Sequence, residues 1–229
     1  MITDYKSLPI GKYLQILAVT DGEPVEERRN PAILSVLDGR TVEELEDLPI
    51  IEFATMMRRA GFLMTPPRPA KTRKEYVCGP FRLAPVVDFK KVTTAQYVDF
   101  QTFAKQSGQA GEPPVVEVLS CLLVPVGHKY CDGYEPGEVQ AAIRENMSVE
   151  DAMSLYSFFT GRLLRLTRRL ATSLKRTARR LPKTTETETV LERLKTLTKP
   201  TVLQSVGDGL QTLMPFQRLS ETLGMPSGE

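Results

Sequence analysis

The chain has 229 residues, with 30 Lys+Arg against 28 Asp+Glu, one His, three Cys and no Trp. Hydrophobic residues make up 41% and charged residues 25%, a composition typical of a folded globular protein and too apolar for a disordered chain. One histidine and three cysteines exclude a disulfide-dense secreted module and any mechanism that needs two histidines.

The N-terminal region begins with two predicted helices. Residues 8–19 carry apolar side chains at helical spacing, and a break follows at residues 21–24. Asn30-Pro31 indicates the cap and first turn of a second helix, which Asp38-Gly39 ends.

Two more helices are predicted before residue 64. Thr41 and Glu44 match a capping box, and the helix that they begin is expected to end near Asp47. Pro49 opens the fourth helix and Gly61 ends it. The apolar residues of that helix are spaced for one buried stripe: Ile50, Phe53, Ala54, Met57 and Ala60.

A proline-rich basic linker at residues 65–74 precedes a predicted β-hairpin over residues 75–89, with its turn at Gly79-Pro80. Residues 86–89 add either a third short strand or a loop. Two or three short strands cannot make an independent sheet, and we therefore expect the hairpin to pack against helices.

Helical signals return after the hairpin. Thr93 or Thr94 caps a helix through Lys105, and residues 115–124 form an apolar segment compatible with either a buried helix or a strand. A short helix is expected around residues 139–143. Ser148 begins a second capping box, and the helix behind it is expected to run past Gly161 to about residue 180.

An internal repeat is the main organising feature of the sequence. The segment around Tyr13 aligns with that around Tyr97, and Thr41-Val-Glu-Glu aligns with Ser148-Val-Glu-Asp, in the same order. We therefore predict a mainly α fold with a minor β component, in which two similar helical halves, residues 7–64 and 92–181, flank the hairpin. Residues 1–181 form the helical core, and residues 182–229 form a polar linker and short amphipathic helices.

The formal net charge of +2 hides a strong segregation. Residues 1–161 hold 17 bases and 22 acids, residues 162–185 hold nine bases and no acid, and residues 186–229 hold four bases and six acids. The basic block falls on a predicted amphipathic helix with a leucine stripe. Its candidate partner-binding side chains are Arg162, Arg165, Arg168, Arg169, Lys175, Arg176, Arg179 and Arg180.

Four interpretations of the basic block stay open: a docked surface helix, an acidic protein partner, a nucleic-acid backbone, or a membrane surface. The lack of aromatic residues in the block weakens single-strand binding, and the lack of Trp or Phe in its apolar stripe weakens membrane binding. Nucleic acid is thus the lesser alternative, and no membrane contact is expected.

Catalytic and metal motifs are weak. Cys121, His128 and Cys131 lie within eleven residues, but no paired cysteine knuckle or nucleophile motif frames them, and no phosphate-binding glycine loop occurs. We expect no catalytic residue, no metal and no cofactor. Tyr130 and Tyr134, in the same loop, either anchor a partner or, more simply, pack the loop on the core.

Six segments between about residues 7 and 180 form a recognisable set: Leu8-Pro-Ile-Gly-Lys-Tyr, Ala32-Ile-Leu-Ser-Val-Leu-Asp-Gly, Thr93-Thr-Ala-Gln-Tyr-Val-Asp-Phe-Gln, Cys121-Leu-Leu-Val-Pro-Val-Gly, Tyr130-Cys-Asp-Gly-Tyr and Ser148-Val-Glu-Asp-Ala. Together these segments resemble a family of duplicated helical proteins of tailed bacteriophages, of the tail-assembly chaperone or tail-morphogenesis kind. The resemblance covers about residues 7–180.

The resemblance implies a non-enzymatic assembly factor that binds another tail protein, of the tape-measure type, in the host cytoplasm. It also leaves open a structural component of the virion, a homo-oligomer, and an acidic helical client for the basic block.

Overall fold

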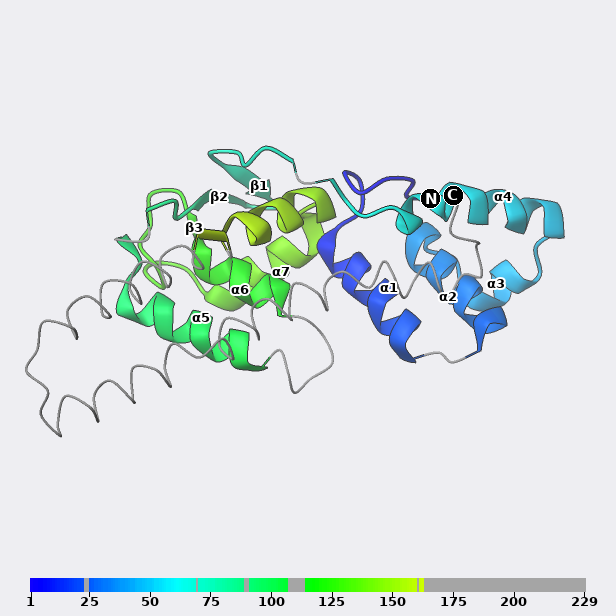
Figure 1. The fold of residues 1–229 in the computed structure, drawn as a ribbon, viewed down its shortest axis with the longest axis horizontal. Coiled ribbons are helices and arrows are strands. Elements are labelled where there is room, and N and C mark those ends of the chain that lie inside the picture. Colours follow the sequence, from blue (N-terminus) through cyan, green and yellow to red (C-terminus); the bar gives the residue numbers. More distant parts are fainter. Residues whose placement is uncertain (23–24, 69, 89–90, 107–113, 160, 163–229) are drawn as a thin grey trace, which may run out of the picture.

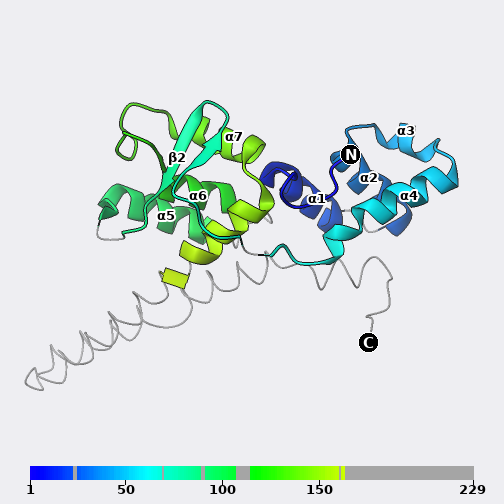
Figure 2. The ribbon, with the colours of Figure 1, turned by 90° about the horizontal axis from the view of Figure 1, so that it is seen from above.

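The computed structural model describes residues 1–22, 25–68, 70–88, 91–106, 114–159 and 161–162. They form a mainly helical protein with one small antiparallel sheet, so the coarse fold class predicted from the sequence is confirmed. Figure 1 shows helices α1–α4 gathered at one end of the molecule, and the sheet with α5–α7 at the other. The same division is visible from above in Figure 2.

The N-terminal group contains α1 (Ile10–Gly22), α2 (Glu26–Asp38), α3 (Val42–Glu46), α4 (Ile50–Ala60) and the 3-10 turn η1 (Gly61–Met64). The predicted end of the second helix and the predicted start of the third are confirmed, because residues close by in the sequence determine both. Gly39 ends α2 with a φ of 90°, which glycine adopts without strain. Thr41 and Glu44 form both hydrogen bonds of the predicted capping box.

The predicted start of the second helix is wrong. The helix α2 begins at Glu26, with Val25 at the cap, and Pro31 lies inside it. A proline inside a helix removes one intrahelical hydrogen bond and its ring clashes with the carbonyl group four residues earlier, at a cost of about 3 kcal/mol. Burial of Ile33, Leu34 and Leu37, each at most 2% exposed, offsets that loss.

The three-stranded sheet has the order β1 (Tyr76–Cys78), β2 (Phe81–Pro85), β3 (Leu123–Pro125). The hairpin is confirmed, with Gly79 at a φ of 55° in the two-residue turn. The third strand comes from the apolar segment, which is helical over α6 (Val115–Leu122) and then extends as β3. Residues 86–88 form no strand, because β3 pairs with β2 instead.

The other helices of the second group are α5 (Thr94–Gln106), α7 (Pro136–Asn146) and a helix at residues 149–159 and 161–162. Thr93 caps α5 through a capping box with Gln96. The Ser148 hydroxyl accepts a hydrogen bond from the Asp151 N–H (3.1 Å), as expected for a helix cap.

The two groups are joined by backbone contacts and one core. The Ile10 N–H donates to Met147 C=O (2.8 Å), and the Val149 N–H donates to Leu8 C=O (2.9 Å), so residues 8–10 and 147–149 form a short antiparallel bridge. Helix α1 packs against α7 beside this bridge. A single hydrophobic cluster contains buried residues of both groups, so the described helices share one core.

The predicted duplication remains a prediction. The aligned residues Tyr13 and Tyr97 have unlike surroundings, because Tyr13 is fully buried and Tyr97 is 52% exposed. The aligned capping residues Thr41 and Ser148 both begin helices, as the alignment requires.

Candidate binding surfaces

The predicted basic surface lies almost wholly outside the described residues. Of its eight side chains, Arg162 alone is described. Its guanidinium donates to the Val87 C=O and lies over the Phe158 ring, 4.9 Å from the centroid. Arg162 therefore fixes the end of the last described helix against the segment that follows β2. The side chains outside the described residues are Arg165, Arg168, Arg169, Lys175, Arg176, Arg179 and Arg180.

The cysteines and the histidine do not come together. Cys121 is buried, whereas Cys131 is exposed at a positive φ of 57°. The His128 Nδ1 hydrogen-bonds the Asp132 C=O (3.0 Å) within its own loop. Across the described part of the chain, no group of three His, Cys, Asp or Glu side chains has an arrangement that could hold a metal ion.

The three thiols are expected to differ sharply in reactivity. Burial raises the pKa of Cys78 and of Cys121 to about 11, so about 0.1% of each is thiolate at pH 8. Cys131 is exposed. Titration of the folded protein with a thiol-specific disulfide reagent at pH 8 should therefore show one fast equivalent, assigned to Cys131 by peptide mapping. Three equally fast thiols would contradict the burial of Cys78 and Cys121, and C131S should abolish the fast phase.

The tyrosine loop packs on the core, as its simpler interpretation predicts. The Tyr130 hydroxyl donates to Asp99 Oδ2 (2.8 Å) and contacts Cys121 Sγ (3.7 Å), which ties the loop to α5 and α6. Burial, followed by the Asp99 hydrogen bond, raises the pKa of Tyr130 above its ordinary value. Both tyrosines pack against the hydrophobic cluster.

The first turn of α4 exposes two adjacent isoleucines, Ile50 and Ile51, of which the sequence pattern places only Ile50 in the core. Ile50 is 82% exposed and Ile51 is 79% exposed, and Ala54 is exposed as well, so the predicted buried positions of Ile50 and Ala54 are wrong. The buried side of α4 is instead formed by Met56 and Ala60, with Phe53 and Met57 partly buried. We call Ile50 and Ile51 the α4 apolar pair. Each has most of its side chain in contact with water, although isoleucine is among the residues most often buried.

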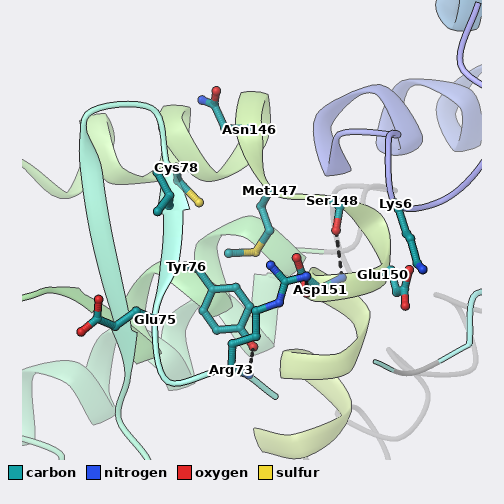
Figure 3. A pocket seen from close by; sticks show the side chains of 11 residues that line it. Lys6, Arg73, Glu75, Tyr76, Cys78, Asn146, Met147, Ser148, Glu150 and Asp151 are labelled. Carbon is teal, nitrogen blue, oxygen red and sulfur yellow. Dashed lines mark hydrogen bonds and ion pairs between the residues drawn. The ribbon is translucent and has the colours of Figure 1, made fainter. Parts of the chain in front are cut away.

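A polar cleft of about 340 Å³ lies beside β1, and no sequence motif indicated it. Its walls come from the N-terminal turn, the basic linker, β1, the end of α7 and the start of the following helix (Figure 3). The lining residues are Lys6, Arg73, Glu75, Tyr76, Val77, Cys78, Asn146, Met147, Ser148, Glu150 and Asp151.

The linker holds one wall of this cleft in place. The Ala70 N–H donates to Ser154 Oγ (2.5 Å), and the Arg73 guanidinium pairs with Asp151 (3.5 Å), one turn earlier on the same helix. The Arg73 N–H also donates to the Tyr76 hydroxyl (2.8 Å). Figure 3 shows Arg73 extending toward Asp151, with the buried Tyr76 and Met147 beside it.

No family model, curated protein or solved structure matches the chain. Among the described helices, none is long and apolar enough to cross a membrane. Inferences about function therefore depend on the sequence features and on the exposed surfaces of the described residues.

Proposed function

We propose that the protein is a non-enzymatic assembly factor of a tailed bacteriophage, which binds another tail protein of the tape-measure type through an exposed apolar surface. The observation that carries the binding role is the α4 apolar pair, Ile50 and Ile51. The phage context comes from the sequence resemblance over residues 7–180. In this proposal the factor covers apolar helices of its client in the host cytoplasm until the tail assembles.

Energetics support a partner at α4. Burying an isoleucine side chain that was fully exposed stabilises a complex by about 1.5–3 kcal/mol. Two such side chains in one helical turn are a suitable centre for a helix-in-groove contact. Arg40 and Glu52 form an ion pair (3.7 Å) beside the pair, giving the apolar centre a polar edge, as many interfaces have.

The test is co-expression with the tape-measure protein encoded by the same phage. The wild-type protein should keep this client soluble and co-purify with it. The double variant I50K/I51K should weaken the complex by about tenfold or more, because truncating central interface residues costs over 1 kcal/mol each. Its own melting temperature should stay near the wild-type value, since both side chains are exposed in the free protein.

The matched control is Y97K/V98K, which changes two adjacent apolar side chains of α5 that are 52% and 54% exposed. It should leave the complex unchanged. Equal weakening by both double variants would point to a general effect of added charge and would contradict a specific role for α4. Unchanged binding by I50K/I51K would contradict the proposed surface.

A structural role in the virion is the principal alternative, and mass spectrometry of purified particles separates it from the chaperone role. A chaperone should be abundant in infected cells and absent from particles. A ring, connector or internal protein should be retained in particles at a fixed ratio to the other tail proteins.

A further inference from the structure

The outward face of α4 changes in character along its length. Its first turn carries the α4 apolar pair, Ala54 is exposed one turn later, and Arg58 and Arg59 are exposed near the C-terminal end. At about 100° per residue, all of these positions except Arg59 fall within about 100° of one another. One face of the helix therefore runs from apolar to small to basic. Figure 1 shows α4 at the end of the molecule away from the sheet.

Acidic residues come directly before this face in the chain. Glu46 is the last residue of α3 and Asp47 is its C-cap, and both are exposed. Neither these acids nor Arg58 and Arg59 form an ion pair with another described residue. The surface therefore carries acid before the α4 apolar pair and base after it, and neither charge is neutralised by a described neighbour.

Such a surface is complementary to a second copy of itself. A two-fold axis at Ala54 makes two α4 helices antiparallel and brings each Ile50 opposite Arg58 of the other copy. The aliphatic stem of an arginine can cover an apolar side chain while its guanidinium group meets a carboxylate beyond it, here Glu46 or Asp47. The small side chain of Ala54 lets the two helix axes approach to about 8 Å.

We propose that two copies of this chain pair antiparallel along α4, with Ala54 at the two-fold axis. Charge complementarity favours this occupant, because one surface holds both members of each ion pair that the pairing forms. One 11-residue helix from each copy makes a small interface, so we expect a weak dimer with a dissociation constant on the order of 10 μM. A client that binds α4 then competes with the second copy, a consequence that rests on the proposed function.

Sedimentation equilibrium of the full-length protein between about 1 and 200 μM tests the pairing, because a weak dimer forms across this range. The wild type should change from monomer to dimer. R58E/R59E, E46R/D47R and A54R should each weaken the dimer by about tenfold or more, since like charges then face each other. The control K71E/K74E changes the net charge as much as R58E/R59E, at exposed linker lysines, and should dimerise like the wild type.

An equimolar mixture of R58E/R59E and E46R/D47R is the sharper comparison. In a mixed pair both ends again join acid to base, so the affinity should return to within about threefold of the wild-type value. A monomeric wild type, variants that dimerise as the wild type does, or a mixture that stays monomeric would each overturn the proposal. The purified chain alone is measured, so this outcome is separate from that of the co-expression with the tape-measure protein.

Discussion

Gly11→Ala is expected to destabilise the protein by about 2 kcal/mol and to lower its melting temperature by about 4–8 °C. A methyl group at position 11 would lie 2.6 Å from the Arg144 carbonyl oxygen and 2.5 Å from Arg144 Cγ. The carbonyl belongs to the backbone of α7, so the two helices must separate at the point where residues 8–10 bridge residues 147–149. Overpacking of this kind costs about 3 kcal/mol, and the better helix propensity of alanine returns about 1 kcal/mol.

Gly22→Ala is the matched control for this prediction, because Gly22 ends the same helix and an added methyl group would meet nothing within 4 Å. It should leave the stability unchanged or raise it slightly. The measurement is thermal unfolding of the wild type, G11A and G22A, monitored by circular dichroism, with comparison of the three melting temperatures. Equal stability of G11A and G22A would show that α1 and α7 are not packed as closely as described.

Much of the helical framework could be predicted because helix ends depend on local chemistry. Thr41, Gly39 and Thr93 act within a few residues of their own positions, and their roles follow from side-chain length and backbone preference. The hairpin at Gly79-Pro80 is equally local. In each case the sequence neighbours supply the hydrogen bonds.

The errors arise where a distant segment decides the outcome. Proline is a frequent first residue of helices, so Pro31 suggested a start, whereas burial of the α2 side chains carries the helix through it. The third strand depends on pairing between Leu123 and Pro85, which lie 38 residues apart in the chain. Ile50 fits the helical period of α4, but no described element covers that turn.

The candidate surfaces could be predicted least. The cleft brings Lys6, Arg73, Val77 and Asp151 together from four separate segments, and no pattern in any of those segments indicates a binding site. The basic block could be recognised from the charges of its residues, but the described structure includes only its first residue, Arg162. Gly11 did carry a signal in the sequence. Glycine inside a helix lowers stability, so its presence there indicates a position that another backbone approaches closely.

Gln96→Glu is expected to destabilise the protein by about 3 kcal/mol at pH 7, although it changes neither length nor shape of the side chain. Gln96 is 2% exposed and joins two helices. Its Oε1 accepts from the Thr93 N–H (2.8 Å), and its Nε2 donates to the Cys121 C=O (3.1 Å) at the end of α6. A carboxylate can accept the first bond, but it places a second buried acceptor against the Cys121 carbonyl.

The pH dependence of Q96E distinguishes this cause from a packing defect. Burial and the facing carbonyl should raise the folded-state pKa of the introduced carboxyl group above its unfolded value of about 4.3. The protonated acid can donate to Cys121, so the deficit relative to the wild type should be small at pH 4 and should grow as the pH rises through the folded pKa. Since one pKa unit corresponds to about 1.4 kcal/mol, a deficit of 3 kcal/mol requires a rise of about two units.

The control Q140E alters a half-buried side chain that donates to Ser120 Oγ (3.2 Å), and it should cost less than about 1 kcal/mol with little change between pH 4 and pH 7. A Q96E deficit that is independent of pH would contradict the buried hydrogen bond to Cys121 and leave α5 and α6 joined by apolar packing alone.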